Sequence, residues 1–282
     1  MTDHSPAPKR AETPFFAGSK PRVLAHRGLT FVGSKNLVGE AAIASIDENS
    51  IQAFITAQDA GAQMIESDLQ VTKDGVAVLF HDDDLARVAG LKRKVRDLNL
   101  AELQKITLEH GARIPTLREA LIALPATRFN LDFKVAGVIA PAVRIIEELG
   151  AHNRILVAGF SDGRRRKALR KLSRPVVTSA GSFTVIRLWL AAKTGNQAAV
   201  NRLAADLNAL QIPTHAGKID LCSPSFISAM HEAGLEIHYW TINEPDQMLA
   251  LLQAGADGLV TDRADLAVEV VDRFRRFGKA AN

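Results

Sequence analysis

Several short apolar segments of this sequence end in ionisable residues whose types suit metal binding and proton transfer. These residues are His26-Arg27-Gly28, Glu66 and Asp68, and His81-Asp82. Side chains two positions apart on a β-strand point to the same face, so Glu66 and Asp68 would share one face. We therefore expect this pair to act together.

A second pair with the same spacing, Asp132 and Lys134, follows a later apolar segment. If both pairs point into one depression, the carboxylates of Glu66, Asp68 and Asp132 converge there. Such a cluster is costly without a cation, because like charges in a half-buried site repel one another. Oxygen ligands of this kind suit a hard divalent ion, Mg²⁺ or Ca²⁺, so the spacing predicts a metal site.

Histidine and arginine beside such a site suit the cleavage of a phosphodiester. His26 and His81 can deprotonate the nucleophile and protonate the leaving alkoxide near neutral pH. Arg27 can bind two phosphoryl oxygens at once, and Lys134 can add a point charge. Trp240, at the end of a late strand, is interpreted either as core packing or as a wall of the substrate site.

The elements that must position these residues alternate between strand and helix along the chain. Strands are predicted at residues 22–26, 64–69, 76–80, 128–133, 154–158, 175–178, 209–212, 236–241 and 258–260. Helices are predicted at residues 49–60, 117–124, 138–149, 164–172, 183–207 with a break near Gly195, 224–233, 245–253 and 266–277. This alternation implies a parallel sheet with right-handed crossovers, either as an eight-stranded barrel or as an open doubly wound sheet.

The positions of the polar residues favour the barrel. No G-x-G-x-x-G follows the first strand, which counts against a dinucleotide-binding open sheet. Polar residues at the C-terminal ends of many different strands are typical of an α/β barrel. We predict a (β/α)8 TIM barrel as a single domain over residues 21–282, preceded by a mobile tail at residues 1–20 that is rich in Pro, Ser and charge.

The bulk composition is that of an ordinary globular protein. The chain has 282 residues, 47% of them apolar, with a net charge of +4 and a single cysteine. The basic residues between 163 and 174 have no aromatic platform or zinc-finger spacing beside them, so we expect no nucleic-acid partner. No signal-peptide core or run of about 18 apolar residues is present, so we expect a soluble cytoplasmic protein without stable membrane insertion. Nothing in the sequence indicates an oligomeric state.

In combination the motifs resemble those of the glycerophosphodiester phosphodiesterases. The matching strings are Ala25-His26-Arg27-Gly28, Glu48-Asn49-Ser50, Ala53-Phe54, Gly61-Ala62, Ile65-Glu66-Ser67-Asp68-Leu69, Thr72-Lys73-Asp74-Gly75, Phe80-His81-Asp82, Ile114-Pro115-Thr116-Leu117, Trp240-Thr241-Ile242-Asn243, Gly255-Ala256-Asp257-Gly258 and Thr261-Asp262. The resemblance implies a (β/α)8 barrel with a small insertion after the third strand. It also implies metal-dependent hydrolysis of glycerophosphodiesters, small-molecule substrates, to sn-glycerol 3-phosphate and an alcohol.

The resemblance assigns roles to individual residues. It implies that Glu66, Asp68 and Asp132 hold Ca²⁺ or Mg²⁺, and it places Glu48 as a further acidic residue next to the metal. It likewise implies that His26 and His81 are the acid–base pair and that Arg27 binds phosphate.

Three departures from the family pattern concern the site. Residues 29–47 separate Gly28 from Glu48 by more positions than the family usually has. This segment is either a surface insertion or a lid over the site, and we favour the lid because the first loop of a barrel lies beside the site. Asp47 replaces the usual proline. Asp132 stands where glutamate is common, so the ion must shift or a water must intervene.

Two other functions remain open. One is phospholipase-D-like or cyclising lyase action on lysolipids or phosphoinositides, in which a substrate hydroxyl replaces water as the nucleophile. The other is a non-catalytic barrel that binds a phosphorylated ligand, which the presence of both histidines disfavours.

Overall fold

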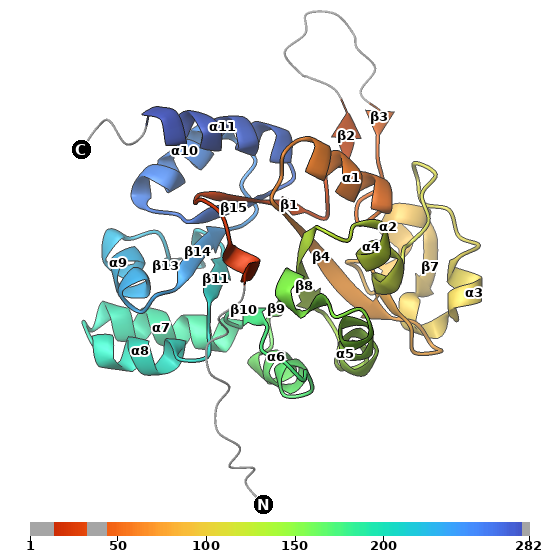
Figure 1. Cartoon of the computed structure of the whole chain (residues 1–282), viewed down its shortest axis with the longest axis horizontal. Coiled ribbons are helices and arrows are strands. Elements are labelled where there is room, and N and C mark those ends of the chain that lie inside the picture. Colours follow the sequence, from red (N-terminus) through yellow and green to blue (C-terminus); the bar gives the residue numbers. More distant parts are fainter. Residues whose placement is uncertain (1–13, 33–43, 278–282) are drawn as a thin grey trace, which may run out of the picture.

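A ring of parallel strands forms the centre of the protein (Figure 1), whose computed structural model describes residues 14–32 and 44–277. The ring strands are β1 (Arg22–His26), β4 (Met64–Val71), β8 (Arg128–Phe133), β9 (Ile155–Ala158), β10 (Val177–Thr178), β11 (Ala209–Ile212), β14 (Glu236–Tyr239) and β15 (Gly258–Thr261). They follow one another around the ring in chain order, and β15 returns to pair with β1. Between β10 and β11 a parallel bridge from Ser179 to Ala209 nearly closes the ring. The predicted (β/α)8 barrel is therefore confirmed.

Helices cover the outside of this ring (Figure 1). They are α1 (Ile51–Asp59), α4 (Leu117–Ala123), α5 (Ile139–Glu148), α6 (Asp162–Leu169), α7 (Ser182–Lys193), α8 (Gln197–Ala204), α9 (Pro224–Glu232), α10 (Pro245–Ala254) and α11 (Ala264–Phe277), with the short 3-10 turns η3 (Ala136–Val138) and η4 (Ala151–Arg154) around α5. The helix predicted at residues 183–207 is broken as expected. Gly195 adopts a left-handed backbone with φ of +67°, and the Asn196 side chain caps α8 by accepting from the Ala199 amide.

One predicted barrel strand lies outside the ring. The segment predicted at residues 76–80 forms β5 (Ala77–Leu79), which pairs antiparallel with the end of β4. Its prediction as the third strand of a parallel barrel is wrong, because the short turn that joins it to β4 cannot span a parallel crossover. The turn instead sends the chain back, and the Phe80 amide donates to the Asp68 carbonyl at 2.9 Å. His81 thus reaches the site from the returning strand.

The predicted insertion follows β5. It contains β6 (Asp84–Leu85), α2 (Ala86–Ala89), β7 (Leu91–Lys94), η2 (Val95–Asp97) and α3 (Leu100–Leu103). It has a small hydrophobic core separate from that of the barrel, made by Val78, Phe80, Leu85, Val95, Leu98, Leu103, Leu108 and Ile114. It follows the segment at 76–80, which was counted as the third strand, so its place in the chain is as predicted; in the ring it lies between β4 and β8.

Two predicted segments fall partly outside the described residues. Of the predicted mobile tail, residues 1–13 lie outside them, whereas Pro14–Phe16 forms the 3-10 turn η1 with Phe15 fully buried. The packed structure therefore begins no later than Pro14. The predicted lid segment is described only at its two ends, where β2 (Phe31–Val32) and β3 (Ala44–Ser45) pair antiparallel. A second small hairpin, β12 (His215–Ala216) with β13 (Ile219–Asp220), follows β11.

A charged network holds the N-terminal ends of the strands together, opposite the polar strand ends. Arg22, at the start of β1, donates to both carboxylate oxygens of Glu236 at the start of β14, at 2.7 and 2.9 Å. Burial would raise the pKa of Glu236, but the hydrogen bonds from Arg22 and His238 lower it to about 2. Residues at this end of a barrel serve stability rather than catalysis.

We expect this network to make the protein sensitive to acid. The pKa of Glu236 is about 2 in the folded chain against an ordinary value of 4.5, so its ionised form stabilises the fold. That contribution is full above pH 4.5 and is lost as the pH falls through 2. A Glu236→Gln variant should lose about 3 kcal/mol of unfolding free energy at pH 7, because Arg22 stays buried without its partner. Its stability should also vary less between pH 5 and 2, as measured by urea titration.

Glu269→Gln is the matched control, since Glu269 is exposed on α11. It should change the unfolding free energy by less than about 0.5 kcal/mol. Equal losses in the two variants would show that the network carries no special stability.

Candidate active site

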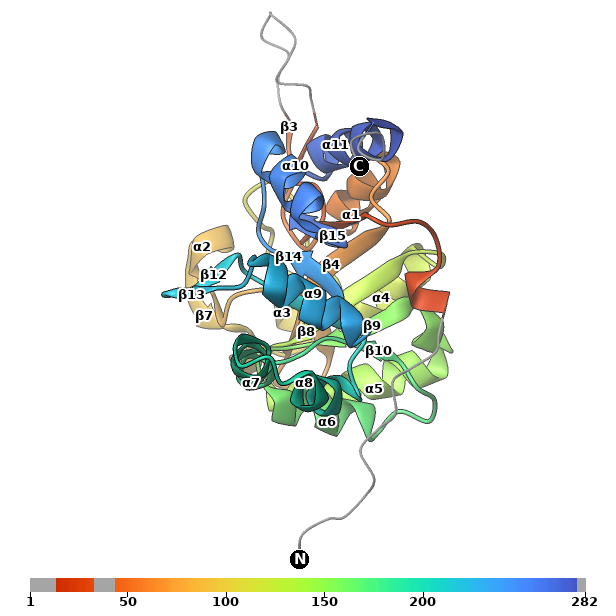
Figure 2. The same cartoon turned by 90° about the vertical axis from the view of Figure 1, so that its left-hand side faces the viewer.

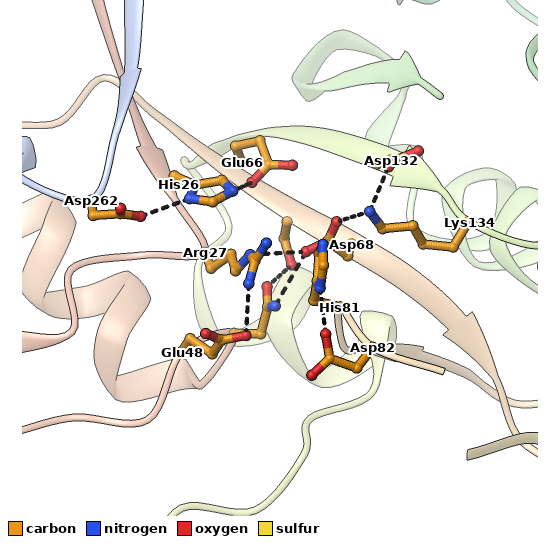
Figure 3. Close-up of polar contacts among 12 residues, drawn as sticks. His26, Arg27, Glu48, Glu66, Asp68, His81, Asp82, Asp132, Lys134 and Asp262 are labelled. Atoms are coloured by element: carbon orange, nitrogen blue, oxygen red, sulfur yellow. Dashed lines mark hydrogen bonds and ion pairs between the residues drawn. The ribbon is translucent and has the colours of Figure 1, made fainter. Parts of the chain in front are cut away.

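The C-terminal ends of the ring strands surround one cavity of about 440 Å³. Of the nine residues predicted for the site, eight line it: His26, Arg27, Glu66, Asp68, His81, Asp132, Lys134 and Trp240. Figure 3 shows the polar members gathered around Asp68. Glu48 is not among the lining residues, although it forms an ion pair with Arg27. All seven ionisable residues that line the cavity were predicted, whereas the polar residues Asn130, Ser179 and Gln211 were not.

His26 is held by a carboxylate from the last strand of the barrel. Its Nδ1 lies 2.7 Å from Oδ1 of Asp262, and its Nε2 lies 3.9 Å from Oε2 of Glu66 (Figure 3). Asp262 is fixed in turn by Asn243, which donates to Oδ2 at 2.8 Å. Because an ionised carboxylate only accepts hydrogen bonds, Nδ1 of His26 carries the proton. Its Nε2 is then the nitrogen available for proton transfer.

His81, like His26, is oriented by a carboxylate that contacts its Nδ1. Its Nδ1 lies 2.6 Å from Oδ1 of Asp82, and Nε of Arg87 donates to the other oxygen of Asp82 at 2.7 Å. Burial would raise the pKa of Asp82, but hydrogen bonds from Arg87 and His81 lower it, so this carboxylate stays ionised. Each histidine therefore has a carboxylate at Nδ1, and its Nε2 makes no hydrogen bond to the described residues.

Arg27 is positioned by an unusual backbone. Its φ is +60°, and its amide donates to the Glu66 carbonyl at 2.9 Å. The next residue, Gly28, has φ of +89°, and a Cβ there would lie 2.7 Å from the Ala53 backbone on α1. Only glycine allows this close approach. The guanidinium of Arg27 bonds Glu48 at 3.0 Å, while its buried Nε has no hydrogen-bond partner.

The three carboxylates of the predicted metal site lie on neighbouring strands. Lys134 bridges two of them, with Nζ 2.9 Å from Oδ1 of Asp68 and 2.9 Å from Oδ2 of Asp132. Two oxygens, Oε2 of Glu66 and Oδ1 of Asp132, are buried without a hydrogen-bond partner. Burial and the charge of Asp68 raise the pKa of Glu66 to about 8. The raised pKa shows that burial and the neighbouring carboxylate disfavour the ionised form of Glu66.

These observations fit a divalent cation in part. Over the ranges 14–32 and 44–277, no three His, Cys, Asp or Glu side chains are arranged to hold a metal as they stand. The amino group of Lys134 lies between the two aspartates and would have to move. The donor set is nevertheless all oxygen, as a hard cation requires, and two of its oxygens lack a hydrogen-bond partner.

Glu48 lies beside this cluster rather than in it. Arg87 donates to its two oxygens at 2.6 and 2.9 Å, in addition to the bond from Arg27. Asn49 follows with φ of +54° and donates to Asp68 at 3.4 Å, so the segment is fixed beneath the site. Asp47, where the family resemblance predicts a proline, accepts from the backbone amides of His110 and Ala112. That contact ties the end of the extended first loop to the insertion.

The opposite wall of the cavity is apolar. Trp240 meets the ring of Phe160 edge to face, with centroids 6.1 Å apart. Val185 and Ile186 of α7 and Leu221 complete this wall. Trp240 lines the cavity and also packs against a hydrophobic cluster of the barrel, so the structure shows features of both interpretations considered for it.

Several residues that orient the site had no predicted role. They are Asp262 and Asn243 behind His26, Asp82 and Arg87 behind His81, and Phe160 in the wall. Asp82 and Asp262 do belong to the quoted motifs, since Asp82 directly follows His81 and Asp262 directly follows β15. Arg87 and Phe160 carried no such signal, since both lie in connections whose paths the sequence does not reveal.

Comparison with known proteins agrees with this geometry. The model of the "Glycerophosphoryl diester phosphodiesterase family" matches residues 26–266. A Mycobacterium tuberculosis protein named "Probable glycerophosphodiester phosphodiesterase 2" is 40% identical over 249 residues, which are 88% of this chain and 89% of that protein. This chain belongs to the glycerophosphoryl diester phosphodiesterase family.

Two further relatives bear on the fold and on the substrate. The crystal structure of a glycerophosphodiester phosphodiesterase from Thermotoga maritima has a TM-score of 0.66 at 23% identity, covering 88% of this chain and 97% of that one. A human protein named as a lysophospholipase D is 36% identical over 101 residues, which are 31% of this chain and 32% of that protein. Membership of the family confirms the prediction of a phosphodiesterase, with the barrel that the family shares.

Proposed function

We propose that this protein hydrolyses glycerophosphodiesters to sn-glycerol 3-phosphate and an alcohol, using His26 and His81 as its acid–base pair and a divalent cation. The observation that carries this proposal is the paired arrangement of the two histidines. Each lines the same cavity, and each is hydrogen-bonded through Nδ1 to a carboxylate, so that Nε2 is the nitrogen available for proton transfer. Two such groups are what one proton removal and one proton delivery require.

The reaction follows from these positions. Water attacks phosphorus and the ester bond to the head-group oxygen breaks. One histidine takes the proton of the water, and the other gives a proton to the departing alkoxide. The Nε of Arg27 lies 3.5 Å from Oδ2 of Asp68 without a hydrogen bond, and the guanidinium can bind a phosphoryl oxygen, while Lys134 faces the same cavity. Both cations offset the charge that grows on phosphorus-bound oxygens.

Glu66, Asp68 and Asp132 are the residues that would hold the cation. When bound, Mg²⁺ or Ca²⁺ would supply positive charge to the phosphoryl oxygens. The two buried oxygens without hydrogen-bond partners, on Glu66 and Asp132, support this assignment. Glu48 as a further ligand stays a prediction, because both of its oxygens bond arginines here.

Phospholipase-D-like action on lysolipids is the second candidate function. It is supported by the apolar wall of Phe160, Ile186 and Trp240, which can accept a hydrocarbon chain beside the polar residues. The partial match to a human lysophospholipase D supports the same reading. If a hydroxyl of the substrate attacked phosphorus in place of water, the alcohol product would be the same and the phosphate product would be a cyclic phosphate.

A substrate panel tests both functions. Purified protein should release sn-glycerol 3-phosphate from glycerophosphocholine, followed with a coupled dehydrogenase. A Trp240→Ala variant should lose turnover of lysophosphatidylcholine more than of glycerophosphocholine if the wall binds an acyl chain. Equal effects on both substrates would remove the second candidate. Absence of turnover on the whole panel would remove the first.

A further inference from the structure

An apolar stripe on α7 faces solvent beside the cavity. Phe183, Ile186 and Leu190 are 67%, 43% and 50% exposed. Their spacing of three and then four residues places them on one face of the helix. We call these three residues the α7 stripe. The opposite face of α7 already packs into the barrel through Val185 and Leu188, so the stripe is a second apolar face without a partner within the described chain.

The α7 stripe adjoins the entrance to the catalytic cavity. Ile186 belongs to both, because it lines the cavity together with Phe160, which is itself 57% exposed. Figure 2 shows α7 on the same side of the barrel as the β12–β13 hairpin, whose Ala216 also lines the cavity. A surface that covered the stripe would therefore lie next to the open side of the site.

The charges on α7 are all positive. The helix contains no acidic residue, and its two basic residues, Arg187 and Lys193, are both exposed. Arg187 lies 5.8 Å from the ring centre of Phe183, and Lys193 lies 4.8 Å from that of Trp189. Apolar side chains flanked by Lys and Arg are what interfacial helices present to an anionic lipid surface. A second copy of the chain on this stripe would instead bring four cations together.

We propose that the α7 stripe docks this protein on the surface of an anionic lipid bilayer. Phe183 and Leu190 enter the interface between head groups and acyl chains, and Arg187 and Lys193 bind lipid phosphates. The binding is peripheral, in keeping with the finding that no described helix is long and apolar enough to cross a membrane. The cavity mouth then opens beside the lipid surface.

Sedimentation with vesicles tests this proposal without any substrate. The full chain should sediment with vesicles of phosphatidylglycerol and phosphatidylcholine, and far less with vesicles of phosphatidylcholine alone. A Phe183→Ser/Leu190→Ser variant should lose roughly tenfold or more of this binding. An Arg187→Ser/Lys193→Ser variant should lose roughly fivefold of the vesicle binding, and added salt should weaken the binding that remains.

Ile122→Ser is the matched control, since Ile122 is 59% exposed on α4 and lies outside the cavity wall. It should leave vesicle binding unchanged. Circular dichroism verifies that each variant is folded. Absence of vesicle binding, an equal loss in the control, or a dimer in light scattering that the stripe variants dissociate would each overturn the proposal. Because the readout is binding, its failure would leave the proposed hydrolysis untouched.

Discussion

A His26→Ala or His81→Ala variant is expected to lose roughly 10²-fold or more of kcat on glycerophosphocholine. The loss follows from the proposed mechanism, in which each ring supplies one proton transfer that water performs poorly. Neither histidine belongs to the hydrophobic clusters of the barrel, and both are only partly buried. The variants should therefore keep their melting temperature within a few degrees, as measured by calorimetry.

His231→Ala is the matched control for this pair. Its ring bonds Asp257 at 2.7 Å near the N-terminal ends of the strands, away from the cavity. It should retain kcat near the unmodified value at 25 °C even if its stability falls. Full activity in His26→Ala or in His81→Ala would remove that residue from the acid–base pair.

Removal of divalent cations with a chelator is expected to abolish turnover, and Mg²⁺ or Ca²⁺ should restore it. The reason is the cluster of Glu66, Asp68 and Asp132, in which two buried oxygens have no hydrogen-bond partner. A cation that binds the folded state and not the unfolded state should also stabilise the protein. The gain in unfolding free energy is about 2.7 kcal/mol when the free cation concentration is a hundred times its Kd. A rise in melting temperature on adding the metal to stripped protein measures this effect without reference to activity.

A Glu66→Gln variant should lose most of the metal-induced rise in melting temperature, because it gives up one charged ligand. Glu269→Gln changes the same residue type on the exposed face of α11 and should keep the rise. Full turnover in protein shown by elemental analysis to be free of divalent metal would contradict the metal assignment.

The local part of the site could be predicted from the sequence because it depends on short-range patterns. The alternation of apolar runs and helices, with polar residues at strand ends, is enough to predict a barrel and to place Glu66 and Asp68 on one face. The strand at 76–80 shows where this reasoning fails. Its composition is that of any buried strand, and only the length of the preceding turn distinguishes an antiparallel return from a new ring strand.

The contacts between the histidines and their supporting residues could not be predicted, because they depend on how the chain closes the ring and folds the insertion. Asp262 is far from His26 in the sequence, and the two meet because β15 pairs with β1 so that Thr261 lies opposite Ala25. No local pattern reveals that pairing. Arg87 was missed for a related reason, since the path of the insertion alone brings it to Asp82 and Glu48. Lys134 was predicted as a phosphate-binding charge, yet its contacts with Asp68 and Asp132 could be seen only in three dimensions.

The central claim is that this site hydrolyses the ester bond between phosphorus and the head-group alcohol of a glycerophosphodiester. Phosphorus NMR of purified protein with glycerophosphocholine and Mg²⁺ or Ca²⁺ tests it most directly. We predict that the diester signal is replaced by that of sn-glycerol 3-phosphate and that free choline is released in an equal amount. No cyclic phosphate should accumulate. Release of phosphocholine and glycerol, accumulation of a cyclic phosphate, or an unchanged diester signal would contradict the claim.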